Sequence, residues 1–317
     1  MIALIGMPRS VTTWVAKLLD SHPKTYYVYE PDSESWLSIP QIVESADAEQ
    51  YKDKVALFLR TIEHSNSLKV KGRLPLFPKS YLSLFDLNFN RALVTFAKLW
   101  ARVFDLKHAS IRFLRPPHGH VTVWKSIESA GRVSAFSQAD YQMKIAALVR
   151  HPCAVINSEL KGEAQKQLSS STPIYKNWGL FEKLLQSTFA HSQGLTVETL
   201  HQVTPVQRLA WPWLIYYTQL QEHDSKENGK VFYHHQFCNQ PKDALRQLLE
   251  FAGLDFDEQT QQYLHQTTTN HSESYYSTPK YPKVASEAWN SQMQPQEIEA
   301  IKQIVMPHIP TELWEQQ

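Results

Sequence analysis

The 317-residue sequence predicts an α/β fold in which a parallel sheet is flanked by helices on both faces, giving three layers. Three observations lead to this prediction. Short apolar runs alternate with amphipathic stretches of helical period, and glycine or proline directly follows several of these runs. The chain is also long enough for one large core, so we expect a single domain over residues 1–317.

The first unit is a strand, a tight loop and a helix. Residues 1–5 form an apolar run that meets Gly6, as a buried parallel strand does where it enters a turn. After the loop, apolar residues at helical spacing give one stripe: Val11, Trp14, Val15, Leu18 and Leu19. Residues 26–29 are the next predicted strand, which ends at Glu30 and Pro31.

The later elements continue the alternation of strands and helices. Further strands are expected in three apolar runs, at residues 121–124, 144–149 and 231–233. Further helices are expected in four amphipathic regions, at residues 41–105 (in pieces), 127–136, 241–252 and 295–305. Residues 267–289 are rich in Thr, Ser, Tyr and Lys without periodicity, which predicts a long, mobile loop.

The composition excludes several classes of partner. Lys and Arg total 32 against 31 Asp and Glu, so the net charge gives no general attraction to nucleic acid or to an anionic membrane. No stretch approaches the roughly 20 apolar residues of a membrane span. The two cysteines, Cys153 and Cys238, lack metal-ligand spacing, which predicts reduced thiols, no metal and a cytoplasmic location. The oligomeric state stays open.

The segment from Gly6 to Thr13 joins the first predicted strand to the first helix. Backbone N–H groups and the helix dipole make such a junction an anion site, and a phosphate is its natural occupant. The loop that binds nucleoside triphosphates has a lysine directly before its hydroxyl residue, whereas this chain has Thr12 there. We therefore expect a P-loop-like fold whose loop binds one 5′-phosphate with an attached group.

The loop residues resemble those of the sulfotransferase family. The family's 5′-phosphosulfate loop reads Pro-Lys/Arg-Ser-Gly-Thr-Thr after a first strand, and the matching positions here are Pro8, Arg9, Ser10, Val11, Thr12 and Thr13. Val11 replaces the usual glycine. A β-branched residue does not readily adopt positive φ, so the loop either has helical dihedrals at Val11 or differs slightly in geometry.

A second segment strengthens this resemblance. Residues 147–158 follow the family's 3′-phosphate segment, which runs strand, Arg, polar residue, Pro, helix, Ser. Arg150 at the end of a strand and Ser158 nearly two helical turns later supply a charged fork and a hydroxyl to one phosphate. The resemblance implies 3′-phosphoadenosine 5′-phosphosulfate (PAPS) as the sulfuryl donor and adenosine 3′,5′-bisphosphate (PAP) as the product, without a metal.

The resemblance also implies catalytic residues. Lys125 matches the lysine that acts on the sulfuryl group in the cytosolic branch, but Ile127 stands where that branch has its histidine base. The segment Tyr-Glu-Pro ending at Pro31 is similar to the carbohydrate-modifying branch, whose glutamate is the base; Glu30 is therefore our first candidate. His118 and His120 are the reserve candidates for the base.

Other parts of the site follow from the same resemblance. Arg9 is expected to stabilise the negative charge that develops on the bridging oxygen. The helices of 41–105 would cover the acceptor cleft, and the loop of 267–289, from Lys280 to Trp289, would cover the nucleotide. The acceptor is a small molecule or glycan that offers a hydroxyl or amine.

Two other functions remain open at this point. The first is a P-loop kinase of a small metabolite, although the loop lacks the kinase lysine. The second is a nucleotide-binding module that has lost catalysis, which is favoured by Val11 and by His235 in a segment where many family members have acidic residues. Intact Glu30 and Lys125 favour an enzyme.

Overall fold

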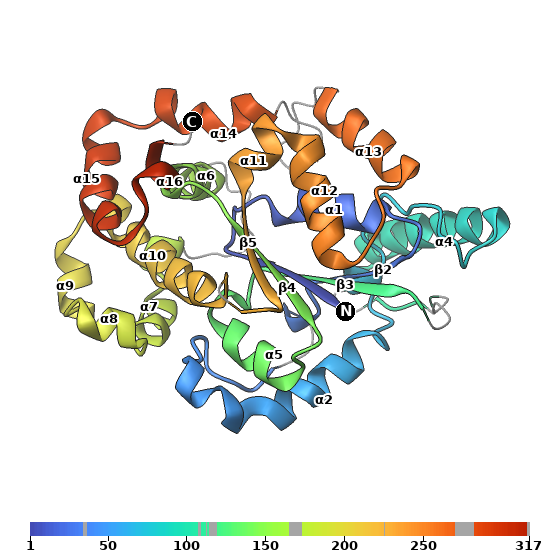
Figure 1. Ribbon diagram of the computed structural model, residues 1–317, viewed down its shortest axis with the longest axis horizontal. Helices are drawn as coiled ribbons and strands as arrows, with labels where there is room; N and C mark the ends of the chain where they lie inside the picture. The colour runs from blue at the N-terminus through green and yellow to red at the C-terminus, as the bar shows by residue number, and fades with distance from the viewer. Residues whose placement is uncertain are drawn as a thin grey trace.

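The computed structural model describes residues 1–33, 37–106, 109–111, 113, 119–164, 173–224, 226–269 and 282–315. At its centre lies a sheet of five parallel strands in the order β2-β3-β1-β4-β5 (Figure 1). The strands are β1 (Ile2–Gly6), β2 (Thr25–Tyr29), β3 (Val121–Ser126), β4 (Lys144–Val149) and β5 (Gly229–Tyr233). All five predicted strands are confirmed, with ends that shift by up to two residues.

The helices lie on both sides of this sheet, as the sequence predicted. The first half of the chain contains α1 (Thr12–Ser21), α2 (Lys52–Ile62), α3 (Leu68–Lys71), α4 (Leu84–Val103), α5 (Val133–Ala139) and α6 (Pro152–Ala164). The second half begins with α7 (Trp178–Leu184), α8 (Thr188–Ser192), α9 (Val197–Gln202), α10 (Pro205–Asp224) and α11 (His234–Asn239). It ends with α12 (Pro241–Ala252), α13 (Glu258–Thr269), α14 (Pro282–Gln292), α15 (Pro295–Val305) and α16 (Thr311–Glu315).

The two faces of the sheet support separate apolar cores because side chains alternate along each strand. Ile2 and Leu4 of β1 pack with α1, α12 and α13 on one face. Ala3 and Ile5 pack with α2, α5 and α10 on the other. The central strand is thus buried on both faces, and its carboxyl end is a rigid platform for the loop that follows.

Several regions differ from the sequence prediction. The helix expected at 127–136 is a 3₁₀ turn, Ala130–Arg132, followed by α5. The sequence also did not predict α7 to α11, α13 and α16. The expected loop at 267–289 has helix at both ends, because α13 continues to Thr269 and α14 begins at Pro282, a residue suited to the first helical turn. Residues 270–281, which include Lys280, lie outside the described residues.

The register of the sheet brings distant segments to one edge. Ile5 pairs with Ser126 and with Ala147, so β1, β3 and β4 end side by side. Tyr29 pairs with Lys125, and Val149 with Tyr233. Ligands of open α/β sheets bind outside the carboxyl ends of the strands, and this edge is where the predicted site residues gather. In the described ranges, no helix combines the length and the apolar composition needed to cross a membrane.

Candidate functional site

The loop after β1 has a strained backbone. Arg9 and Val11 both have left-handed dihedrals, with φ of 66° and 64°. Val11 therefore takes the glycine-like conformation, and helical dihedrals at this position, one of the two possibilities left by the sequence, are wrong. Holding a non-glycine residue in this backbone conformation destabilises the folded state by about 1–3 kcal/mol. Hydrogen bonds from Ser10 N to Met7 O (3.2 Å) and from Trp14 N to Val11 O (3.1 Å) hold the turn.

The same loop has the features of an anion site. The N-cap residue Val11 makes no side-chain cap, and the first turn of α1 contains no acidic residue, so the N–H groups of Thr12 and Thr13 have no intrahelical partner. The Ser10 hydroxyl is fully buried and has no hydrogen-bond partner in the described part of the chain. A Cβ on Gly6 would lie 2.7 Å from Leu148 O, so only glycine allows this close approach to β4. These groups fit a bound phosphate.

The two sequence motifs meet in the structure. Arg9 Nε donates to Ser158 Oγ (3.1 Å) and Arg9 Nη2 donates to Ser158 O (3.2 Å), although the residues are 149 positions apart. Arg150 Nη1 in turn donates to Arg9 O (2.9 Å). Glu159 Oε2 lies 3.5 Å from Arg9 Nε, a contact that the sequence did not predict. Burial raises the pKa of Glu159, which Arg9 opposes.

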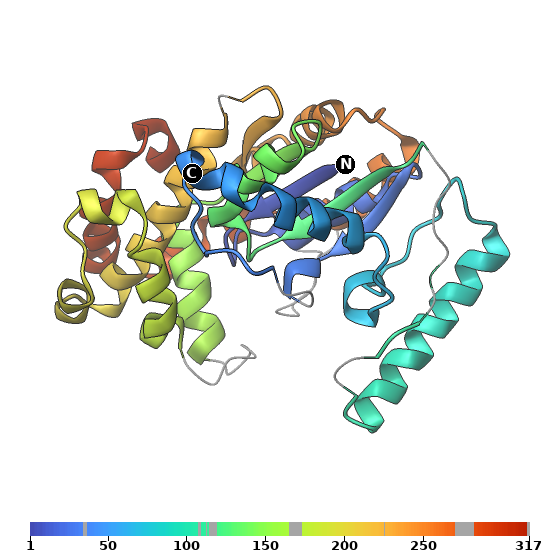
Figure 2. The same cartoon turned by 90° about the horizontal axis from the view of Figure 1, so that it is seen from below.

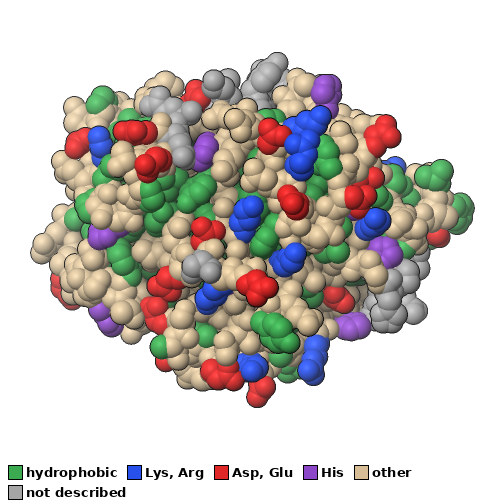
Figure 3. Space-filling view, in the orientation of Figure 1, with side chains coloured by type: hydrophobic (Ala, Val, Ile, Leu, Met, Phe, Trp, Pro, Cys, Tyr) green, Lys and Arg blue, Asp and Glu red, His purple; other side chains and the backbone are tan. Residues whose placement is uncertain are grey.

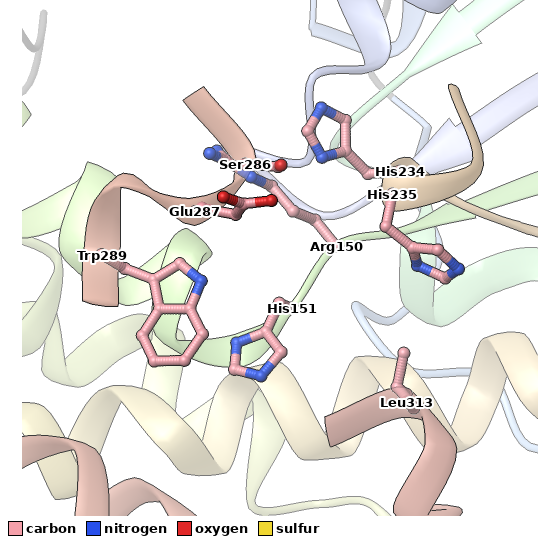
Figure 4. Close-up of a pocket in the computed structure, with 8 residues that line it drawn as sticks. All are labelled: Arg150, His151, His234, His235, Ser286, Glu287, Trp289 and Leu313. Atoms are coloured by element: carbon pink, nitrogen blue, oxygen red, sulfur yellow. The ribbon is translucent and has the colours of Figure 1, made fainter. Parts of the chain in front are cut away.

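A pocket adjoins Arg150 where β4 and β5 end. Its lining comes from the β4–α6 junction, α11, α14 and α16: Arg150, His151, His234, His235, Ser286, Glu287, Trp289 and Leu313 (Figure 4). The His151 ring stacks on Trp289 with a centroid distance of 4.4 Å and an interplanar angle of 8°. The sequence placed Trp289 over the nucleotide, and the structure brings it to this pocket.

Burial sets the charge of the pocket. It lowers the pKa of Arg150 to about 10 and that of His151 to about 4. Burial also lowers the pKa of His234 well below its ordinary value. At neutral pH Arg150 is therefore a cation beside neutral imidazoles, and the Glu287 carboxyl lines the same pocket (Figure 4). Arg150 offers the pocket a charged fork for an anion.

The predicted base and the predicted sulfuryl-binding lysine form a buried ion pair. Lys125 Nζ donates to Glu30 Oε1, and the two residues are 1% and 8% exposed. Glu30 N donates to Lys125 O (2.8 Å), and Glu30 has a positive φ of 42°, which turns the chain out of β2. Burial lowers the pKa of Lys125 despite the opposing effect of Glu30.

Asp32 extends this pair into a network that the sequence did not predict. Its Oδ2 accepts hydrogen bonds from Ser126 Oγ and from Ser129 Oγ, the latter at 2.6 Å. Burial raises the pKa of Asp32 in spite of these bonds. The network fixes the turn after β3 against the turn after β2, so the position of Lys125 relative to Glu30 is held from both sides.

One of the two reserve candidates can be located in the structure. His118 is outside the described residues. His120 precedes β3 and therefore lies at the amino end of the sheet, where its Nε2 is 3.2 Å from Ser80 Oγ and its ring contacts that of Tyr81 at 4.6 Å. Parallel strands place this end opposite to Glu30, so the structure does not bring His120 to the Glu30–Lys125 pair.

A second cavity borders the edge strand β2. Its described lining combines aromatic rings with cations: Asp20, Tyr26, Tyr27, Lys71, Arg73, Leu76, Phe77, Lys79, Tyr81, Leu82, Leu87, Asn90 and Phe113. Arg73 Cζ lies 4.8 Å from the centroid of the Tyr29 ring, and Lys125 Nζ lies 4.8 Å from the same centroid. The Tyr29 ring is thus a common neighbour of Lys125 and of Arg73, which lines the cavity.

The cations that line this cavity, and Lys17 beside it, differ in their partners. Lys17 Nζ donates to Asp20 Oδ2 (2.6 Å), and Lys79 Nζ lies 3.1 Å from Asp20 Oδ1. Burial alone would raise the pKa of Asp20, but Lys17 and Lys79 lower it. Lys71 Nζ lies 3.6 Å from the centroid of the Tyr26 ring. Asp20 is the only acid among the described lining residues, and it already binds two lysines.

Comparison with known proteins completes this description. The family model described as Sulfotransferase family matches residues 2–204. No curated protein sequence matches the chain. Similar solved structures include the sulfotransferase domain from the curacin biosynthetic pathway, with 14% identity, 98% of each chain covered and a TM-score of 0.43. A sulfotransferase from Alicyclobacillus acidocaldarius has 14% identity, 99% of this chain and 93% of that chain covered, and a TM-score of 0.42.

A mouse sulfotransferase complexed with PAP has 12% identity, with 97% of this chain and 85% of that chain covered, and a TM-score of 0.45. The family model covers well over half of the sequence, including both phosphate motifs and the Glu30–Lys125 pair. The chain belongs to the sulfotransferase family.

Proposed function

We propose that this protein is an enzyme that transfers the sulfuryl group of PAPS to a hydroxyl or amine of its acceptor, with Glu30 as the general base. The observation that carries the proposal is the buried pair of Glu30 and Lys125 beside the anion loop. Glu30 directly follows β2, Lys125 lies near the carboxyl end of β3, and the loop follows β1, which is adjacent to β3. A proton acceptor and a cation thus lie next to the place where a phosphosulfate would bind.

The donor would be held by two groups of residues. The 5′-phosphosulfate end would bind the N–H groups and hydroxyls of the loop, with Ser10, Thr12 and Thr13 as donors. The 3′-phosphate would bind Arg150 and Ser158. The buried Ser10 hydroxyl without a partner in the described residues supports the first assignment, and the pocket beside Arg150 supports the second.

The reaction would be an in-line displacement at sulfur. Glu30 accepts the proton of the acceptor O–H or N–H as the new bond to sulfur forms, and the bond from sulfur to the 5′-phosphate oxygen breaks, releasing PAP. Lys125 donates to the sulfuryl oxygens, whose charge changes during transfer. By analogy with phosphoryl transfer, positioning and positive charge supply most of the rate enhancement.

Arg9 is the third proposed catalytic residue. Its guanidinium contacts Ser158 and Glu159, so it lies between the two phosphate motifs. We propose that Arg9 stabilises the charge that develops on the bridging oxygen while it stays hydrogen-bonded to Ser158. This role would link the 3′ segment to the chemistry at the 5′ end.

The cavity beside β2 is the proposed acceptor site, in agreement with the acceptor-covering role expected for residues 41–105. Lys71 and Arg73 line it together with several tyrosine and phenylalanine rings, while its acid is already paired. These contacts favour an acceptor that combines an apolar or aromatic body with an acidic group. Removing Arg73 should then raise KM for acidic acceptors by about 10-fold, since an ion-assisted hydrogen bond contributes about 1.5 kcal/mol or more.

Labelled PAPS incubated with an acceptor library tests the proposal. We expect label in an acceptor, preferentially an acidic one, and stoichiometric PAP release. A library that contains acidic and neutral versions of the same phenols, sugars and amines separates the two claims. Transfer that favours neutral acceptors would contradict the acceptor class alone. PAP release without label transfer, or phosphorylation from ATP with magnesium, would contradict the function itself.

A further inference from the structure

Helix α4 stands away from the body of the molecule at one side (Figure 2). It is 20 residues long, and only Leu87 and Val94 are buried. A capping box supports its start, since Ser83 Oγ accepts from Asp86 N (3.1 Å) and the Asp86 side chain accepts from Ser83 N. The helix is therefore well formed while most of its surface lies outside the core.

This exposed surface is strongly apolar. Nine of the twelve large apolar side chains that are exposed in the described ranges belong to residues 84–106: Leu84, Phe85, Phe89, Phe96, Leu99, Trp100, Val103, Phe104 and Leu106. Scattered exposed apolar residues are ordinary, but a concentration on one helix marks an interaction surface. Figure 3 shows apolar side chains at the tip of this projection.

The spacing of these residues indicates what the surface binds. One stripe, here called the α4 seam, contains residues separated by 4, 3, 4, 3 and 4 positions: Phe85, Phe89, Ala92, Phe96, Leu99 and Val103. This is the narrow apolar stripe of a coiled coil, which pairs with another helix. The buried Leu87 and Val94 are seven positions apart and lie on the opposite side of the helix, so packing onto the body leaves the seam uncovered.

We propose that the α4 seam binds the α4 seam of a second copy of this chain, with the two helices antiparallel. The two-fold axis crosses the seam at the level of residue 94 along the helix, between Ala92 and Phe96. In that arrangement Phe85 faces Val103 of the second copy and Phe89 faces Leu99 of the second copy. Ala92 faces Phe96 of the second copy, so a small residue receives a large one at the centre. A parallel pair would instead oppose alanine to alanine and phenylalanine to phenylalanine, which packs poorly.

The available area agrees with a stable dimer. Five exposed aromatic side chains, each more than half exposed, lie on this surface: Phe85, Phe89, Phe96, Trp100 and Phe104. At roughly 200 Å² per aromatic side chain they present on the order of 600 Å². The four exposed aliphatic side chains bring this wider surface close to the roughly 800 Å² per partner that stable interfaces bury; it consists of the seam and its flanking residues Leu84, Trp100, Phe104 and Leu106.

A membrane surface is a poorer match. Helices that bind anionic lipid bear lysine and arginine on their polar face. Of the three cations on α4, Arg91 donates to Leu76 O (2.7 Å from Nη2) and Lys98 is partly buried, with its pKa lowered by burial and then by Arg73 and Lys17. The third cation, Arg102, is exposed, and the chain as a whole has a net charge of only +1.

Pairing would also affect the cavity beside β2. Leu87 and Asn90 of α4 line that cavity, so a second copy bound to the seam would hold one of its walls in place. The proposal itself does not depend on the proposed reaction.

Sedimentation velocity of the full chain with a matched pair of variants tests the second-copy partner. We expect a dimer for the parent and, for Phe96→Glu, a dimer dissociation constant raised by about 100-fold or more, because two charges would enter the centre of the interface. Leu57→Glu on α2 is the control, since Leu57 and Phe96 are 63% and 62% exposed. A monomeric parent at tens of micromolar, or equal dissociation by both variants, would overturn the proposal. A monomeric parent that co-floats with anionic vesicles, while Phe96→Glu does not, would also overturn the proposal.

Cysteine cross-linking tests the direction of the helices. Antiparallel pairing predicts that Phe85→Cys protein mixed with Val103→Cys protein gives a disulfide-linked heterodimer, whereas neither variant links to itself beyond the background of the parent with Cys153 and Cys238. Self-linking of each single variant without heterodimer would show parallel pairing and refute the proposed arrangement.

Discussion

The carboxyl ends of β4 and β5 are enclosed by α6, α11, α14 and α16. The cavity beside the edge strand β2 is instead bordered by α3, by the loop after it and by the projecting helix α4 (Figures 1 and 2). In the first region Arg150 is buried beside neutral imidazoles. In the second, Lys71 and Arg73 lie against aromatic rings. The Glu30–Lys125 pair lies between them. Under the proposed function, the first region is the donor side and the second a more open acceptor side, and the two share one proposed reactive centre.

The largest effect is expected where the two regions meet. Glu30→Gln keeps the size of the side chain but cannot accept a proton at neutral pH, so transfer should fall by about 10²–10⁴-fold. PAP affinity and melting temperature should stay near those of the parent. Steady-state transfer rates and PAP calorimetry on one preparation check this prediction. A Gln variant that retains full transfer activity would remove Glu30 as the base.

Variants of the donor side should separate it from the acceptor side. Arg150→Ala should weaken PAP binding by about 10–100-fold and Ser158→Ala by about 5-fold, since charged hydrogen bonds contribute about 1.5–3 kcal/mol and neutral ones about 1. Arg73→Ala should leave PAP affinity unchanged. Calorimetric titration with PAP measures all three. Equal losses in Arg150→Ala and Arg73→Ala would contradict the division into two sides.

Acid should destabilise the enclosed donor side. His151 has a folded pKa of about 4 and an unfolded pKa near 6.5, so below pH 6.5 the unfolded chain binds the proton first. The free energy of unfolding should therefore fall as the pH drops from about 6.5 towards 4. Melting curves of the parent, of His151→Phe and of the exposed His191→Phe check this. His151→Phe should be less sensitive to pH, and identical slopes in all three proteins would count against the assignment.

The smallest effect concerns the strained loop. Val11→Gly removes the strain of positive φ, about 1–3 kcal/mol, but adds chain entropy of about 0.5–1 kcal/mol to the unfolded state. We expect a gain of about 1 kcal/mol in the free energy of unfolding, measured by urea denaturation. Val11→Ala is the control, because alanine stays strained there. A glycine variant less stable than the alanine variant would show that the loop is not strained at this position.

The sequence predicted the donor side better than the acceptor side, for a physical reason. Each strand is a short apolar run that ends at a turn, and both phosphate motifs are contiguous, so local patterns suffice. The contact of Arg9 with Ser158 and Glu159 depends on packing across about 150 positions and could not be read from spacing. The Glu30–Lys125 contact was likewise not predicted, although both residues were.

The missed helices show the limit of periodicity. In α10, five consecutive residues from Trp213 to Tyr217 are buried, and Pro212 lies inside the helix. A helix that is buried on most sides has no amphipathic stripe, and proline normally indicates a helix end. The apolar spacing around Phe96 was recognised as helical, but its exposure could be seen only in the structure. Arg73 and Asp32 belong to no sequence motif. They were identified only by their contacts with Tyr29 of β2 and Ser126 of β3, respectively.

The most direct test of the central claim is the melting temperature of the parent with PAP, ATP or GTP, each with and without magnesium. The account predicts that PAP raises the melting temperature without magnesium, because a ligand at 100 times its Kd stabilises the fold by about 2.7 kcal/mol. ATP and GTP should have little effect, since the loop has Thr12 in place of the lysine that binds a triphosphate. A shift with ATP that requires magnesium, together with no shift with PAP, would contradict a PAPS-dependent sulfotransferase and favour a kinase.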